Sequence, residues 1–123
     1  MTSLDPGPVP STTRVTESQS VGLRAIAVHE QGRVAVVVHG ELDLGSAPVL
    51  RREISALLAL PIETIELDLD GLEFVDSGGV RLLADLRRDA SEHRIPLSIS
   101  AASAPVRNVL ELTGRTDLLD ATP

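Results

Sequence analysis

The most informative part of the sequence is the stretch Leu69-Asp-Gly-Leu-Glu-Phe-Val-Asp-Ser-Gly-Gly-Val80, around which we expect the rest of the chain to be arranged. Residues 64–70, which lead into it, alternate apolar and acidic side chains, as in a β-strand with one buried face. From Val80 onward, apolar residues recur at helical spacing. The stretch therefore predicts a strand, a short crossing segment and the start of a helix.

The predicted helix start contains residue types that suit modification and binding. Asp76 and Ser77 are both N-cap types, because each side chain can accept hydrogen bonds from the free amides of a first turn. Those amides and the helix dipole would also favour a phosphate on Ser77. Gly78 and Gly79 have no side chains, so a partner can approach the backbone closely. The simpler interpretation is an ordinary N-cap followed by two flexible glycines.

Three short motifs follow one another along the chain. Phe74-Val-Asp-Ser-Gly-Gly79 resembles the hallmark of the STAS-domain anti-sigma factor antagonists, an Asp-Ser-x-Gly turn with Ser, Thr or Ala at x, after a Phe-x-Asp approach. Gly40-Glu-Leu-Asp43 is similar to the element that closes an early strand in that family, and Leu112-Thr-Gly114 is similar to its Ser/Thr-Gly step after a late helix. The resemblance covers residues 21–119.

The resemblance implies a partner and a switch. In the family, the serine after the aspartate is phosphorylated by an anti-sigma factor with serine kinase activity, a role that falls on Ser77. A PP2C-type phosphatase is the second implied partner. Relatives commonly carry Ser or Thr where this chain has Gly78, which removes a neighbouring hydroxyl. The predicted partner-binding residues are Gly40, Glu41, Asp43, Ser46, Phe74, Asp76, Ser77, Gly78, Gly79 and Arg81.

Composition narrows the possible functions. The chain has no cysteine, and all eleven of its basic residues are arginine, which excludes thiol chemistry and lysine-dependent catalysis. The formal net charge of −7 argues against nucleic acid and anionic membranes as ligands. We find no apolar run of about 20 residues and no signal peptide, so we expect a cytoplasmic protein. No residue spacing is typical of a metal or cofactor site, and we predict neither.

Length and patterning predict one α/β domain. The 123 residues suffice for a single core, which we place at residues 21–120 after a disordered tail at residues 1–20. Residues 117–123 are too short for a further helix, so the chain is either abbreviated relative to the family or ends in a strand. We expect a STAS-like mixed sheet of four to five strands, with an N-terminal antiparallel hairpin, then parallel strands, and helices mainly on one face.

Local sequence patterns predict two helix starts and a cation, Arg81, at an unusual position in a third helix. Ser46 and Ser103 each precede Ala-Pro and predict two helix starts. Arg81 lies in the first turn of the central helix, where a cation opposes the helix dipole. It is four residues from Ser77 and four from Asp85, so either a phosphate on Ser77 or the Asp85 carboxylate can be its partner.

Glu41 and Asp43 lie two residues apart at the end of a predicted strand. Two carboxylates at a strand end can indicate a metal or an acid–base pair, but a solvated acidic turn is the simpler interpretation. The family resemblance instead makes them part of a docking surface beside Ser77.

Three functions remain to be compared. The leading one is an anti-sigma factor antagonist that binds its partner unmodified and is released by phosphorylation of Ser77. A second is a STAS module used as a scaffold, for example beside a transporter or in a stress-signalling complex, with Ser77 acting only as a cap. The third, a receiver-type phosphoacceptor, needs a clustered acid pair and a late-strand lysine, and the chain has no lysine. We therefore predict that the protein is not an enzyme.

Overall fold

The computed structural model describes residues 13–20 and 22–119. The strands are β1 Thr13–Ser20, β2 Leu23–Glu30, β3 Arg33–Leu42, β4 Thr64–Val75 and β5 Leu97–Ala102. The helices are α1 Ala47–Leu58, α2 Ser77–Glu92 and α3 Ala104–Leu112, followed by the single 3-10 turn η1 Thr116–Leu119. Residues 117–119 thus belong to a 3-10 turn and not to a final strand, which was one of the two expectations for this end, and residues 120–123 lie outside the described residues.

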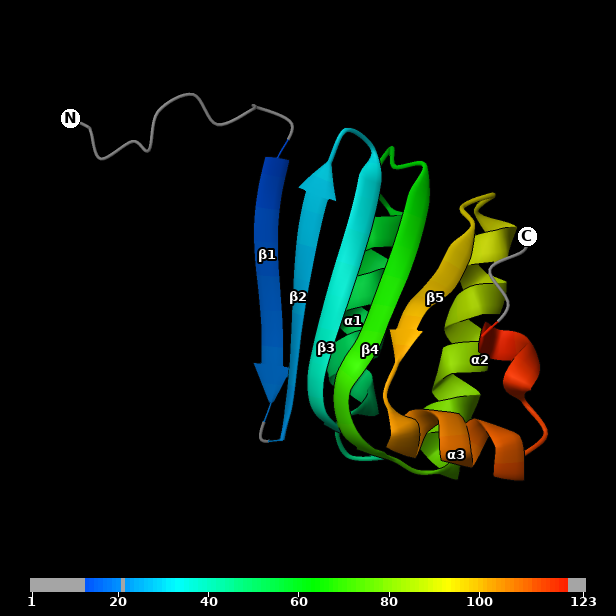
Figure 1. Ribbon diagram of the computed structural model, residues 1–123. Coiled ribbons are helices and arrows are strands. Elements are labelled where there is room, and N and C mark those ends of the chain that lie inside the picture. The colour runs from blue at the N-terminus through cyan, green and yellow to red at the C-terminus, as the bar shows by residue number, and fades with distance from the viewer. Residues whose placement is uncertain (1–12, 21, 120–123) are drawn as a thin grey trace.

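The five strands form one mixed sheet in the order β1-β2-β3-β4-β5 (Figure 1). β1, β2 and β3 are antiparallel, whereas β4 runs parallel to both β3 and β5. Gln31 and Gly32 connect β2 to β3 with φ values of 53° and 83°, as a tight hairpin turn requires. The predicted mixed sheet, with its hairpin followed by parallel strands, is therefore confirmed.

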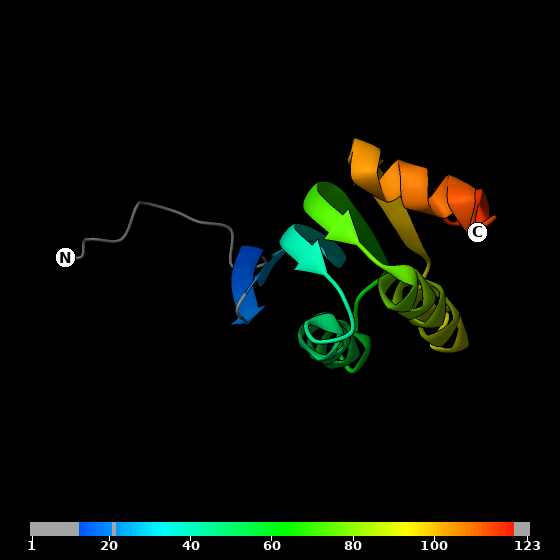
Figure 2. The same cartoon turned by 90° about the horizontal axis from the view of Figure 1, so that it is seen from below.

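Helices lie on both sides of the sheet, but unequally. α1 and α2 cover one face, and α3 lies on the other side, where it contacts β4 (Figure 2). On β4 the apolar residues Ile65, Leu67 and Leu69 are fully buried, while Glu66 and Asp70 between and beyond them are exposed. Among the described residues, no helix combines the length and apolar character that crossing a membrane requires.

The prediction of a disordered tail at residues 1–20 is wrong for Thr13–Ser20, which form the edge strand β1. Thr13–Ser20 pair along their whole length with β2, although their polar composition gave no apolar period. The reason lies in α1, where the buried carboxylate of Glu53 accepts hydrogen bonds from the hydroxyls of Thr16, at 3.0 Å, and Ser18, at 2.5 Å. This strand packs through hydrogen bonds rather than through apolar side chains, which hydrophobic patterning does not detect.

The parallel pairing of β3 and β4 brings together the residues that follow the two strands. Because parallel strands end at the same edge of a sheet, the residues after β3 and after β4 meet. Glu41 pairs with Phe74 and Leu42 pairs with Val75, and the Asp76 amide then donates to the Leu42 carbonyl at 3.2 Å. The loop that leads into α1 and the start of α2 therefore lie side by side.

Candidate protein-interaction site

At the start of α2, one residue caps the helix and the next residue carries an exposed hydroxyl. Asp76 is the N-cap, and its carboxylate accepts a hydrogen bond from the Gly79 amide at 2.7 Å. Ser77 is the first helical residue and is exposed, and its hydroxyl makes no hydrogen bond within the described part of the chain. The interpretation of Ser77 as the cap is therefore wrong, because the neighbouring carboxylate already occupies that role.

The two glycines after Ser77 differ in their surroundings. A Cβ on Gly79 would lie 2.7 Å from the Leu42 carbonyl oxygen and 2.7 Å from the Val75 side chain. A Cβ on Gly78 would meet the Asp76 carboxylate at 3.3 Å and little else. Gly79 is thus required for α2 to pack against the end of β3, whereas Gly78 lies closer to the surface.

Internal contacts shape the loop between β3 and α1. Gly40 has a φ of 104°, and a Cβ there would lie 2.0 Å from the Gly22 carbonyl oxygen. Ser46 is buried at the N-cap position, but its hydroxyl donates to the Glu41 carbonyl at 2.8 Å instead of capping α1. The Asp43 carboxylate accepts from the Ser46 amide at 2.9 Å. These contacts hold the loop in one conformation beside α2.

Two exposed apolar side chains lie near the start of α2. Phe74 precedes it at the end of β4 and is 46% exposed. Leu44, in the loop after β3, is 79% exposed, and its side chain comes within 4.0 Å of the position that a Cβ on Gly78 would take. Sequence reasoning found Phe74 but missed Leu44, whose signal was an apolar residue inside a polar turn. Exposed apolar residues beside a polar, modifiable group are a common composition of protein interfaces.

The predicted site residues therefore fall into two groups in the structure. The members of the first are at least partly exposed around the start of α2 and the loop after β3: Glu41, Asp43, Phe74, Asp76, Ser77, Gly78 and Arg81. The members of the second support this surface from within the domain: Gly40, Ser46 and Gly79. Binding of a partner by any of them stays a prediction. We name the exposed group, together with Leu44, the Ser77 surface.

Arg81 is exposed and makes no ion pair with a carboxylate among the described residues. Its alternative partner Asp85 instead lies 3.6 Å from the Arg51 guanidinium and 3.3 Å from that of Arg88. One of the two partners considered for Arg81 is thus engaged elsewhere, and the cation beside Ser77 is available.

A groove of about 580 Å³ runs from Ser77 to the end of α3. Besides Ser77, it is lined by Val80, Arg81, Ala84, Asp85, Arg88, Thr113 and Arg115. Arg115 binds both carboxylate oxygens of Asp117 at 3.0 Å, and this hydrogen bonding lowers the pKa of the Asp117 carboxyl and raises that of Arg115. The groove thus brings residues of α2 and of the third sequence motif to one place.

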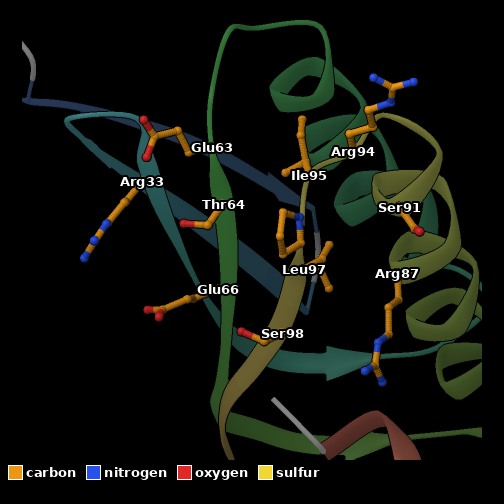
Figure 3. Close-up of a pocket in the computed structure, with 11 residues that line it drawn as sticks. Arg33, Glu63, Thr64, Glu66, Arg87, Ser91, Arg94, Ile95, Leu97 and Ser98 are labelled. Atoms are coloured by element: carbon orange, nitrogen blue, oxygen red, sulfur yellow. The ribbon is translucent and has the colours of Figure 1, made fainter. Parts of the chain in front are cut away.

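A second depression, of about 560 Å³, lies near the start of β5, and its residues do not converge. Figure 3 shows Arg33 and Glu66 extending on one side of the strands, whereas Arg87 and Ser91 come from α2 on the other side. We assign no ligand to this depression, because its polar groups share no common point.

His29 is a buried polar residue on β2. Burial lowers the pKa of its imidazole, and the charge of Arg14 lowers it further, against the opposing effect of Glu53. No cluster of three or more His, Asp or Glu residues that would hold a metal ion occurs in the described ranges.

Comparisons with solved structures give the fold a family context. An anti-sigma factor antagonist from Mycobacterium paratuberculosis is 26% identical, with a TM-score of 0.69 over 81% of this chain and 85% of that one. The anti-sigma factor antagonist SpoIIAA in its unphosphorylated form is 22% identical, with a TM-score of 0.64 over 89% of both chains. At that identity, the second likeness concerns the fold alone.

A curated relative comes from a different kind of protein. Human sulfate anion transporter 1 is 39% identical over 72 residues, which are 58% of this chain. The chain spans only 10% of the length of that transporter.

The family itself follows from a match over most of the chain. The family model described as "Mlab, STAS domain" matches residues 26–120. These residues contain most of the β2–β3 hairpin, the Ser77 surface and α3, so the match includes all three motifs that carried the sequence resemblance. The resemblance is confirmed, and the chain belongs to the STAS domain family.

Proposed function

We propose that this protein is a bacterial anti-sigma factor antagonist whose Ser77 surface binds an anti-sigma factor with serine kinase activity. The unmodified protein occupies the anti-sigma factor and thereby frees a sigma factor for transcription, for example in a stress response. Phosphorylation of Ser77 ends the interaction, and a PP2C-type phosphatase restores it. In this proposal the protein acts in the cytoplasm as a binding module and carries out no catalysis of its own.

One observation carries the proposal most directly. The Ser77 hydroxyl is exposed and free of hydrogen bonds within the described residues, and the exposed apolar residues Leu44 and Phe74 belong to the same surface. A hydroxyl with no structural role can be reached by a kinase without unfolding of the helix. Apolar neighbours supply the contact area that a partner protein would bury.

The charge of the surface explains how phosphate would act as a switch. Glu41, Asp43 and Asp76 already make this edge of the domain acidic. A phosphate adds a charge of about −2 at its centre. If the partner is complementary to the unmodified surface, the phosphate needs to reduce the binding free energy by only about 3 kcal/mol to weaken binding roughly a hundredfold. Burial of a poorly paired phosphate supplies a loss of that size.

A second function is favoured by the match to the human transporter. A STAS domain with 39% identity to part of a sulfate anion transporter can also be a non-switching interaction module in a transporter-associated or stress-signalling complex. In that case the Ser77 surface would still bind a protein, but the state of Ser77 would not control the binding. The two functions therefore make different predictions for the same variants.

The test compares three forms of the full chain in binding to candidate anti-sigma factors. We expect wild type and Ser77→Ala to bind with similar affinity, and Ser77→Asp to bind at least tenfold more weakly, measured by calorimetry. Incubation of wild type with the same anti-sigma factor and ATP should place phosphate on Ser77, as located by mass spectrometry, with ADP as the second product. Tight binding by Ser77→Asp, together with no phosphate on Ser77, would favour the non-switching module.

Replacement of the apolar neighbours tests the proposed contact area. Leu44→Ala and Phe74→Ala should each weaken anti-sigma factor binding by about tenfold or more, because large apolar side chains at an interface centre often contribute above 1 kcal/mol. Both side chains are exposed, so the melting temperature should change little.

The matched control for these two variants is Val15→Ala. Val15 is 63% exposed, but it lies on β1 at the far edge of the sheet (Figure 1). Affinity should therefore be unaffected in this variant. An equal loss of affinity in Val15→Ala would contradict the placement of the interface.

A further inference from the structure

The helix amides near Ser77 are already partly satisfied. The Asp76 carboxylate holds the Gly79 amide, and the Asp76 carbonyl accepts from the Val80 amide at 3.0 Å. A phosphate on Ser77 therefore shares the start of α2 with a neighbouring carboxylate, which repels it. Cationic side chains that approach the phosphate from the groove side add charge-assisted hydrogen bonds to whatever the remaining helix amides supply.

The groove between α2 and the end of α3 offers those side chains. Arg81 lines the groove one helical turn after Ser77, a spacing at which side chains on a helix meet. Arg81 has no carboxylate partner among the described residues, whereas Arg88 is 3.3 Å from Asp85 and 3.6 Å from Asp89. Arg81 is therefore the arginine of α2 that a new anion beside Ser77 would engage.

A second arginine reaches the groove because of the turn after α3. The Thr113 hydroxyl donates to the Val109 carbonyl at 2.8 Å and so has no proton left for a phosphate. Gly114, with a φ of 70°, reverses the chain, and the Arg115 amide bonds back to the Leu110 carbonyl at 2.8 Å. This turn, which is the third sequence motif, brings Arg115 into the groove that Ser77 also lines.

We propose that this groove binds the phosphoryl group of phosphorylated Ser77, with Arg81 and Arg115 as its ligands. The inference rests on the proposed function, because it requires phosphate on Ser77. Guanidinium groups bind phosphate oxygens through charge-assisted hydrogen bonds, and two of them offset most of a charge of about −2. The phosphate then competes with Asp117 for Arg115, so modification of α2 also changes the contacts of η1.

The test is the pKa of the phosphate itself, measured by ³¹P NMR on the full chain with phosphoserine incorporated at position 77 during synthesis. A nearby cation stabilises the dianion and so lowers the second phosphate pKa, which is about 6 without such contacts. Arg81→Ala and Arg115→Ala should each raise this pKa by about half a unit. Asp117→Asn should lower it, because the competitor for Arg115 is removed.

The control is Arg52→Ala, which removes the same charge from an exposed position on α1 that does not line the groove. It should leave the phosphate pKa nearly unchanged. Shifts in Arg81→Ala and Arg115→Ala no larger than in this control would overturn the inference. A shift in Arg81→Ala alone would overturn the part assigned to Arg115.

Failure of this inference and failure of the proposed function are distinguishable. Phosphoserine is introduced without a kinase, so the titration can be measured even if no anti-sigma factor modifies Ser77. Conversely, an unshifted phosphate leaves partner binding by the unmodified protein intact, as the binding assays with Ser77→Ala and Ser77→Asp would report.

Discussion

Gly40→Ala is expected to destabilise the domain by about 4 kcal/mol, a large part of the 5–15 kcal/mol that usually separates folded from unfolded states. The backbone at Gly40 has a φ of 104°, which contributes about 1–3 kcal/mol of strain for a residue with a Cβ. The new Cβ would also lie 2.0 Å from the Gly22 carbonyl oxygen, so the strands must separate there. That movement stretches the 2.7 Å hydrogen bond from the Glu41 amide to the same carbonyl.

Urea denaturation checks this value, with Gly22→Ala as the control. Gly22 directly precedes Leu23, the residue that pairs with Gly40, and also has a positive φ, of 90°, but beyond its chain neighbours no described atom lies within 4 Å of its ideal Cβ. Gly22→Ala therefore measures backbone strain without the clash, and we expect a loss of about 1–2 kcal/mol. If both variants lost equal stability, the close contact between strands would not be the cause.

Gly79→Ala is expected to cost about 2–3 kcal/mol and to abolish partner binding at the same time. Its Cβ would overlap the Leu42 carbonyl oxygen and the Val75 side chain, both at 2.7 Å, and forced packing of this kind usually costs about 1–3 kcal/mol. The start of α2 must then move away from β3, which disturbs the Asp76 cap and displaces Ser77. Thermal denaturation and anti-sigma factor binding measure the two effects separately.

Gly78→Ala is the matched control for this prediction. The substitution is the same and lies one residue earlier in the same helix, where the nearest atom is the Asp76 carboxylate at 3.3 Å. Alanine favours a helix over glycine by about 1 kcal/mol, which offsets a small shift of that carboxylate. We expect the stability of Gly78→Ala to lie within 1 kcal/mol of wild type. A destabilised Gly78→Ala together with a stable Gly79→Ala would contradict the described packing.

The sheet and helices could be predicted because hydrophobic periodicity determines them. The alternation in residues 64–70 and the helical spacing after Val80 gave β4 and α2. β1 was not predictable in this way, because a buried Glu53 on α1 holds it through the hydroxyls of Thr16 and Ser18. Hydrogen bonds between residues more than thirty positions apart leave no local pattern in a sequence.

The site was predictable in its location but not in the roles of its residues. The motifs brought Glu41 and Phe74 together correctly, since the two residues pair across β3 and β4. Sequence alone could not decide which of Asp76 and Ser77 caps α2, because both residue types serve equally well. It also gave Gly78 and Gly79 one common role, whereas only coordinates reveal that Gly79 faces the Leu42 carbonyl. Leu44 was missed because an apolar residue inside a polar turn does not show by itself whether its side chain is buried or exposed.

Because Asp76 and not Ser77 caps α2, the proposed phosphorylation of Ser77 would be readily reversible. A serine that served as the N-cap would lose its capping hydrogen bond each time it was phosphorylated, and each modification would destabilise the helix. Here the Asp76 carboxylate caps the helix one position earlier, so the proposed phosphorylation and dephosphorylation of Ser77 would leave that cap in place. The proportion of altered molecules would then follow the opposing activities of the proposed kinase and phosphatase alone, with no refolding step to delay the response.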